Sequence, residues 1–565
     1  MTAMTPPGSA PGASGPVSAS ADPPGRDMSA AAEIAAVAVA TGVGALTRLV
    51  PVVTAGFPLN DGGLFLAMAD DVRRSGALIP STASYNGLGI PFAYPPLALD
   101  LTGIAMGLTG SDGIWILRFV PALVALATIP VVYLLGRAIL PSRFHAFVAA
   151  LLFAFVPRSF EWLVMGGGIT RAPGFLLAAL AILATIGVAR RASARSAMAA
   201  GVCIGLTGLT HPQALVFALV SIAIITAAYA RSRRALGLAA GAVAIGAAVL
   251  LPWVALIVAE HGTGPLLSAA SSGANPIQSI AYLTSLALTD ETFWRIVAPL
   301  GLVGFLFELS RRRWLLPAWT VVLVLADPRS AANFTMVPLS LLAAVGFVDV
   351  LVERLFPGAL PFDARSVWPP SVVRRRGFEA LFAAVVILGI VTGSFAAVSP
   401  GYMIPVPAAT RDAMAWARAN TEPQASFLVV SGRDWFDDAT AEWFPTLTGR
   451  RSVGTLQGYE WLGRDAWLAQ NAAADELVKC APRTVSCVDA WMRDHRAADY
   501  VFIPKGRVAG PAGPDDCCVP LRETVRTSPR YEVVYDGDGA TIARILPDPS
   551  AVVGPPKPAV LSSRP

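Results

Sequence analysis

Long apolar segments alternate with short polar ones over the first 400 residues. About 20 apolar residues are enough for a helix to cross the hydrocarbon core of a bilayer. Eleven segments have this character, and we expect each to form a spanning helix. They lie near residues 30–53, 114–135, 144–157, 172–189, 197–211, 212–230, 235–259, 293–309, 314–326, 331–351 and 378–398. The pattern predicts an α-helical polytopic membrane protein.

Beyond about residue 400 the sequence is polar, and helical and strand periods alternate. Two runs read as buried strands, and two others flank an Asp-Gly-Asp-Gly turn as a hairpin does. The expected helices are 410–420, 464–480 and 487–496, and the expected strands are 425–431, 498–504, 531–535 and 541–546. This part is predicted to be a small α/β extracytoplasmic domain.

Four parts follow from these patterns. Residues 1–29 and 549–565 have too few large apolar side chains to form a core, so we expect disordered tails, the first of them cytoplasmic. The membrane domain is expected over 30–399, with a long outer loop at 54–113, and the α/β domain over 400–548.

The composition excludes an ordinary soluble protein. The chain is 54% hydrophobic and 14% charged, with a mean hydropathy of +0.58, whereas soluble domains carry about 25% charged residues. The net charge of +5 does not indicate nucleic-acid binding, because the arginines fall in short clusters between apolar segments.

These arginine clusters predict the topology, since cytoplasmic loops carry the excess of basic residues. Five clusters become cytoplasmic if the amino terminus is inside and the α/β domain outside. The assignment requires that 95–108 does not cross, so we expect an outer juxtamembrane or re-entrant helix there. The clustered residues are Arg137, Arg143, Arg190, Arg191, Arg195, Arg231, Arg233, Arg234, Arg311, Arg312, Arg313, Arg374, Arg375 and Arg376.

Four cysteines lie in the polar part of the chain: Cys480, Cys487, Cys517 and Cys518. In a domain outside the cytoplasm they permit two disulfides, with the pairing open. Their spacing does not match a zinc site.

Asp61 is the main candidate for chemistry. It follows the first apolar segment and is expected in the first turn of a helix ending at Gly76, where the helix dipole favours a carboxylate. A carboxylate at a membrane surface suits deprotonation of an acceptor hydroxyl. The alternative interpretation is that Asp61 only caps its helix.

Several short motifs occur in a specific order around Asp61. Ile79-Pro80 and Tyr94-Pro95-Pro96-Leu97 follow it, and then come Arg118-Phe119-Val120-Pro121-Ala122-Leu123 and Val132-Tyr133-Leu134-Leu135-Gly136-Arg137. This order resembles the C-type integral-membrane glycosyltransferases, among them the protein O-mannosyltransferases and the lipid A aminoarabinose transferases. The resemblance implies an active-site acid in the first outer loop and a polyprenyl-phosphate sugar donor.

The sequence also departs from this pattern. Gly62 stands where many relatives have Glu, and Tyr94 stands where the aminoarabinose transferases have Lys. The outer membrane loops contain no Trp-Trp-Asp and no Asp-x-Asp, which argues against the oligosaccharyltransferase branch. No metal ligands are assigned, and use of a divalent cation stays open.

A lipid-phosphate donor requires cations or amides at the outer surface. Arg158 and Arg171 bound a glycine-rich loop whose amides suit an anion. Arg329 and His211 lie in later outer turns, and Tyr94 completes the predicted substrate-binding residues. For Arg171 the alternative is an interfacial helix anchor, and for His211 a structural role.

The sequence therefore predicts a membrane glycosyltransferase of the bacterial cytoplasmic membrane. It would transfer a sugar, with inversion, to a glycan, lipid or protein hydroxyl at the outer face, and Asp61 would be the general base. Two alternatives are open: a non-catalytic transporter or assembly protein for lipid-linked precursors, and an oligosaccharyltransferase.

Overall fold

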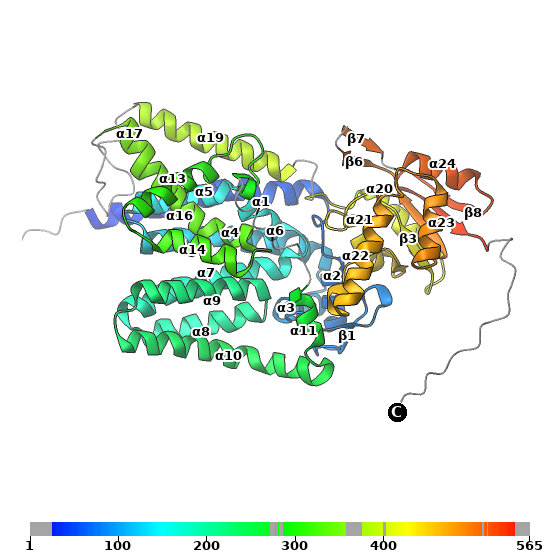
Figure 1. Cartoon of the computed structure of the whole chain (residues 1–565), viewed down its shortest axis with the longest axis horizontal. Coiled ribbons are helices and arrows are strands. Elements are labelled where there is room, and N and C mark those ends of the chain that lie inside the picture. Colours follow the sequence, from blue (N-terminus) through cyan, green and yellow to red (C-terminus); the bar gives the residue numbers. More distant parts are fainter. Residues whose placement is uncertain are drawn as a thin grey trace, which may run out of the picture.

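A helical bundle and an α/β domain lie end to end in the computed structural model, with the domain beyond one end of the bundle (Figure 1). The structure describes residues 25–271, 277, 281, 286–357, 376–398, 403–510, 513–516 and 518–547. The two predicted terminal tails lie almost wholly outside these ranges.

All eleven predicted apolar segments are helical over most of their length. Seven described helices are long and apolar enough to cross a membrane, and four further apolar helices are shorter. The bundle consists of α1 (Gly25–Ala55), α4 (Gly113–Ile139), α5 (Arg143–Phe155), α7 (Gly168–Arg191), α8 (Ala194–Gly208), α9 (Pro212–Tyr229), α10 (Arg233–His261), α13 (Val297–Ser310), α14 (Leu315–Ala326), α15 (Ala331–Phe334), α16 (Met336–Val345), the π-helical turn η4 (Gly346–Val352), α17 (Glu353–Leu355) and α19 (Arg376–Val398).

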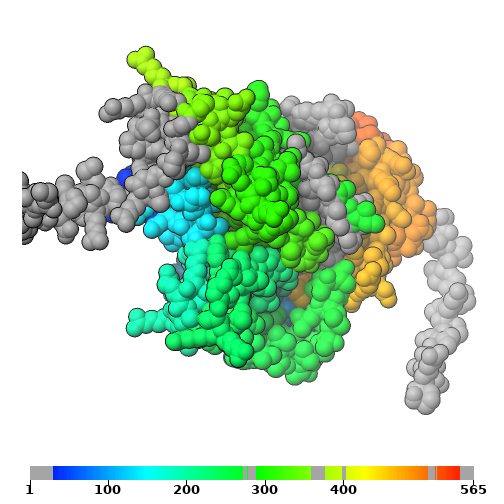
Figure 2. Space-filling view, turned by 60° about the vertical axis from the view of Figure 1, so that its left-hand side comes forward, coloured from blue at the N-terminus to red at the C-terminus, as the bar shows by residue number. Residues whose placement is uncertain are grey.

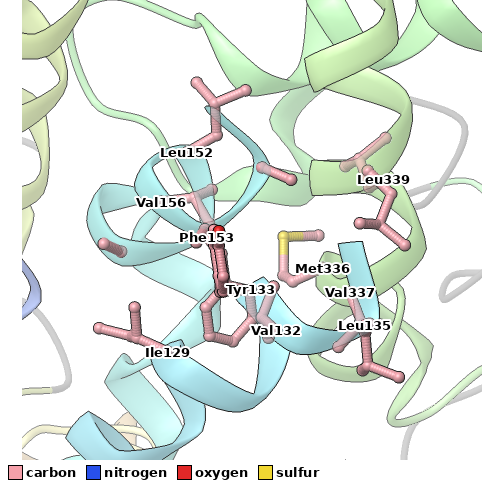
Figure 3. Close-up of a cluster of buried hydrophobic side chains, with 14 of the residues drawn as sticks. Ile129, Val132, Tyr133, Leu135, Leu152, Phe153, Val156, Met336, Val337 and Leu339 are labelled. Carbon is pink, nitrogen blue, oxygen red and sulfur yellow. The ribbon is translucent and has the colours of Figure 1, made fainter. Parts of the chain in front are cut away.

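Apolar side chains fill the space between the bundle helices. Figure 3 shows part of this core, where α4 and α5 meet α16. Phe153 and Met336 are fully buried there, and Tyr133 is almost so. Close packing of such side chains orients the helices relative to one another.

Successive bundle helices run in alternating directions, so the arginine-rich turns after α4, α7, α9 and α13 lie at one end of the bundle (Figure 1). At that end Arg137 and Arg143 contact the Glu33 carboxylate at 2.6 and 3.3 Å. Arg374 and Arg375 lie outside the described residues. The α/β domain lies beyond the opposite end (Figure 1).

The α/β domain contains a mixed five-stranded sheet in the order β4-β3-β5-β9-β8. Strands β4, β3 and β5 are parallel, whereas β9 pairs antiparallel with both β5 and β8. The strands are β3 (Ser426–Val429), β4 (Arg451–Ser452), β5 (Tyr500–Pro504), β8 (Tyr531–Asp536) and β9 (Ala540–Ile545), with a separate hairpin of β6 (Arg507–Gly510) and β7 (Gly513–Asp516). The predicted strands and hairpin are confirmed.

Helices α20 (Ala408–Asn420), α21 (Ala439–Thr448), α22 (Arg464–Val478), α23 (Val485–Asp494) and α24 (Val519–Thr527) complete the domain. Sequence periodicity predicted three of them. A disulfide joins Cys480 and Cys487. Cys518 is also disulfide-bonded, whereas Cys517 lies outside the described residues.

The long loop 54–113 packs into the core of the α/β domain. It contains α2 (Gly63–Arg74), β1 (Thr82–Ala83), β2 (Ile90–Pro91) and α3 (Leu97–Thr109). Phe57, Phe65 and Tyr85 share one buried apolar cluster with Trp443 and Phe502. The loop, though separated from the domain by more than 280 residues, is thus part of its hydrophobic core.

The predicted juxtamembrane segment is α3. It packs on α2 at the junction between the bundle and the domain (Figure 1). The space-filling view shows green bundle helices directly against the orange domain (Figure 2). The junction is therefore a packed interface rather than a flexible linker.

Asn86 tests how much this interface contributes to stability. Its buried side chain donates to the Ser452 carbonyl at 2.9 Å and accepts from the Ser452 amide at 2.7 Å. Asn86→Ala leaves both backbone groups without partners, so we expect a loss of about 1–3 kcal/mol. The thermal unfolding midpoint of the purified protein should fall, whereas the exposed control Asn420→Ala should keep it. Equal midpoints for both variants would contradict this.

Candidate active site

A cavity of about 1230 Å³ lies between the 54–113 loop, the bundle and the α/β domain. Five of the six side chains predicted to act on substrate line it: Asp61, Tyr94, Arg171, His211 and Arg329. They come from loops and helix starts far apart in the sequence. The fold therefore gathers nearly the whole predicted set in one space.

Arg158 is the predicted residue that does not line the cavity. Its guanidinium lies 3.0 Å from the Asp290 carboxylate. This places Arg158 beside the loop that precedes α13, part of which is outside the described residues.

Asp61 does not lie in the first turn of α2, as expected from the sequence. The helix begins at Gly63, with Gly62 as its N-cap, and no side chain of its own segment caps it. The Asp61 carboxylate instead turns to α7. It accepts a hydrogen bond of 3.0 Å from the Gly167 amide and another from the Arg171 guanidinium. The interpretation of Asp61 as a cap of α2 is wrong, because its carboxylate contacts another helix.

Gly167 allows this contact because it has no side chain. A Cβ there would lie 2.6 Å from the Asp61 carboxylate and 2.9 Å from the Arg171 guanidinium. The glycine-rich loop was expected to present amides to an anion. The anion bound to the Gly167 amide is the Asp61 side chain, at the positive end of the α7 dipole.

Arg171 is held on several sides at the start of α7. Besides the Asp61 ion pair, it donates to the Trp162 carbonyl at 3.3 Å, and its guanidinium lies 5.3 Å from the Trp162 ring centroid. A cation over an aromatic face gains from the ring quadrupole. The Arg171 guanidinium is therefore fixed by a carboxylate, a carbonyl and an aromatic ring.

His211 is the N-cap of α9, and its Nδ1 accepts from the Ala214 amide at 3.3 Å. This tautomer carries its proton on Nε2. Burial lowers the pKa of His211 to about 3, with the Arg171 and Arg329 charges adding to the decrease. The His211 imidazole is therefore neutral at physiological pH. Its Nε2 proton is available for a hydrogen bond, while its Nδ1 caps α9.

Arg329 lies between α14 and α15. Burial lowers its pKa, whereas the nearby Glu460 and Asp327 carboxylates raise it. Guanidinium groups stay charged even when buried. Two cations, Arg171 and Arg329, therefore line this part of the cavity.

Tyr94 closes the cavity beside Asp61. Its hydroxyl lies 3.0 Å from the Thr170 hydroxyl, and its ring packs edge-on against Phe65 and Trp461. Burial raises the pKa of Tyr94 to about 12, so the phenol keeps its proton.

Sequence analysis missed the cavity wall that the α/β domain contributes. This wall carries Trp435, Phe436, Trp461, Arg464 and Trp467. Trp435 and Phe436 are 38% and 42% exposed, although both are large aromatic residues. Exposed aromatic residues beside charged groups are typical of ligand sites. Exposure depends on the tertiary fold, so the sequence carried no clear signal.

Glu442 makes a contact that the sequence did not predict. It accepts hydrogen bonds from the amides of Gly62, Gly63 and Leu64 at 3.3, 3.0 and 3.1 Å, and so caps α2 from another domain. Burial raises the pKa of Glu442 to about 8; the Asp61 charge adds to the increase and the amide bonds oppose it.

Among the described residues, no group of three or more His, Cys, Asp or Glu side chains is arranged to hold a metal ion. One structurally similar protein, the oligosaccharyltransferase of Archaeoglobus fulgidus, has been solved in complex with Zn and sulfate.

Residues 93–256 match the family of dolichyl-phosphate-mannose-protein mannosyltransferases. Among curated proteins, no sequence matches the chain significantly.

Several solved structures are similar. ArnT from Cupriavidus metallidurans, in the apo state, has a TM-score of 0.54 at 16% identity, over 91% of this chain and 98% of ArnT. AglB from Archaeoglobus fulgidus, in complex with an inhibitory peptide and a dolichol-phosphate, has a TM-score of 0.51 at 14% identity, over 84% and 69%. The mycobacterial arabinofuranosyltransferase AftD has a TM-score of 0.54 at 16% identity, over 92% and 40%.

These likenesses establish the fold. The matched segment is similar to the mannosyltransferases, and the fold is similar to those of ArnT, AglB and AftD.

Proposed function

We propose that this chain transfers a sugar from a polyprenyl-phosphate donor to an acceptor hydroxyl at the outer face of the membrane, with inversion. The observation that carries the proposal is the shared cavity, in which the Asp61 carboxylate pairs with Arg171 and a second cation, Arg329, also lines the wall. The match to a family that uses a lipid-phosphate sugar supports the donor class.

The reaction is a single displacement. The acceptor oxygen attacks the anomeric carbon as the bond from that carbon to the phosphate oxygen breaks. The acceptor proton moves to Asp61, and the electron pair leaves with the polyprenyl phosphate. Arg171 and Arg329 balance the charge that develops on the phosphate, and the Nε2 proton of His211 supplies a neutral donor.

The Asp61–Arg171 ion pair suggests an order of events. In the structure the Arg171 guanidinium contacts the carboxylate that would act as the base. A donor phosphate competes for the same guanidinium, because phosphate is a strong bidentate partner for arginine. Donor binding thereby draws Arg171 from Asp61 and leaves a carboxylate oxygen for the acceptor proton.

The walls of the cavity suit two different substrates. Leu215, Val216, Leu250 and Val254, from α9 and α10, form an apolar side where the polyprenyl chain would lie. The aromatic wall of the α/β domain faces the acceptor. The arginine-rich turns at the opposite end support the proposal that this end lies outside the membrane.

Asp61→Asn tests the base. We expect transfer from a purified polyprenyl-phosphate sugar to fall by about 10²–10⁴-fold, the usual contribution of a general base. Asp70→Asn is the matched control, because Asp70 lies on α2 and, in the part of the chain that the structure describes, forms ion pairs with Arg73 and Arg74 of the same helix. Full turnover by a normally folded Asp61→Asn protein would exclude Asp61 as the base.

Arg329→Gln tests the phosphate contact. Loss of a charged hydrogen bond costs about 1.5–3 kcal/mol, which corresponds to a rise of roughly ten- to a hundredfold in donor KM. Arg158→Gln should change donor KM little, since Arg158 lies outside the cavity lining. Steady-state kinetics on both variants decide the point. An equal rise in donor KM for both would contradict the assignment.

The neutral state of His211 is tested by NMR of histidine-labelled protein. The chain has four histidines, and His211→Gln identifies the signal. This signal should stay at the neutral position from pH 5 to 8. The unfolded chain protonates His211 near pH 6.5 and the folded protein near pH 3, so acid between these values lowers stability. A titration midpoint near 6.5 in the folded protein would overturn the assignment.

A further inference from the structure

Side chains of helix α21 in the α/β domain form hydrogen bonds with the backbone on both sides of Asp61. After Asp61, Glu442 accepts from three successive amides, and the Thr446 hydroxyl donates to the Gly63 carbonyl at 2.7 Å. Before Asp61, the Trp443 indole donates to the Asn60 carbonyl at 2.7 Å. Three neighbouring positions on one helix therefore hold a segment more than 370 residues away.

The backbone around Asp61 packs closely against α21. Gly62 has a φ of 145°, which favours glycine, and a Cβ there would lie 2.6 Å from the Trp443 ring. A Cβ at Gly63 would lie 2.8 Å from the Glu442 carbonyl oxygen. No side chain in the segment caps α2, so the first amides of this helix depend on Glu442.

The Glu442 residue is itself held by the long loop. Its side chain is buried, and the Tyr85 hydroxyl donates to its backbone carbonyl at 2.6 Å. Tyr85 belongs to the same long loop as Asp61. The long loop therefore holds the Glu442 backbone through Tyr85, and the Glu442 side chain holds the start of α2 in the same loop.

We propose that Glu442 is a positioning residue for Asp61 and that the α/β domain thereby completes the active site. The inference rests on the proposed function of Asp61. The Asp61 side chain is directed by Gly167 and Arg171 of α7, whereas its backbone is set by Glu442, Trp443 and Thr446 of α21. A shift of about 1 Å at a catalytic group lowers the rate about a hundredfold.

Glu442→Gln in the full-length protein tests the proposal. Glutamine keeps one acceptor oxygen but brings an amide NH₂ toward the backbone N–H groups of α2. We expect kcat to fall about a hundredfold, with donor KM nearly unchanged because the phosphate contacts remain. Glu523→Gln, an exposed change on α24 of the same domain, should leave kcat as it is.

Hydrogen exchange separates positioning from general stability. In Glu442→Gln, the peptide covering residues 60–66 should exchange faster, whereas the peptide covering β5 should exchange as in the wild type. Thr446→Val provides a milder second variant in case Glu442→Gln does not fold, with a smaller fall in kcat and faster exchange confined to the same peptide.

Two results would overturn the proposal. One is wild-type kcat and wild-type exchange at residues 60–66 in both variants; the other is faster exchange throughout the sheet of the α/β domain, which would indicate a purely structural role. A normally active Asp61→Asn protein would instead refute the proposed function. The exchange at residues 60–66 would then still report whether Glu442 holds this segment.

Discussion

Carboxyl groups bound to backbone amides at two helix N-termini hold this site together. Asp61 accepts from the Gly167 amide at the start of α7, and Glu442 accepts from the first amides of α2. Amides at a helix start have no partners within the helix, and the helix dipole favours negative charge there. Each carboxyl group comes from a different part of the chain than the helix it binds. The two contacts therefore join the bundle, the long loop and the α/β domain at one point.

The electrostatics of the cavity follow from this arrangement. Arg171 pairs with Asp61 and lies near His211, while Arg329 lies near the Glu460 carboxylate. Burial strengthens such interactions, because little water is present to screen them. Cationic and acidic side chains therefore line the same cavity, which suits a reaction that moves a proton to a carboxylate and negative charge to a phosphate.

Prediction from the sequence succeeded where the information is local. Runs of apolar residues predicted the bundle helices. Two strand-like runs on either side of an Asp-Gly-Asp-Gly turn predicted β8 and β9. Asp61 was singled out because a carboxylate beside an apolar segment is costly. Arg171, His211 and Arg329 were chosen because the family resemblance implies a lipid-phosphate donor, and all four residues line the cavity. The role assigned to Asp61 in its own helix was wrong, because a cap from the adjacent segment and a contact to α7 cannot be told apart in sequence.

The sequence by itself determined the kind of protein: a helical membrane bundle with a polar α/β domain and charged residues at specific loop positions. Such features depend on side-chain type and on periods of a few residues. Only the tertiary structure decided which loops meet. Gly62 left α2 without an acidic residue at its start, and Glu442 supplies one from a helix far along the chain. Contacts of this kind depend on the packing of the long loop into the domain core. The residues next to Gly62 in the sequence do not indicate this packing.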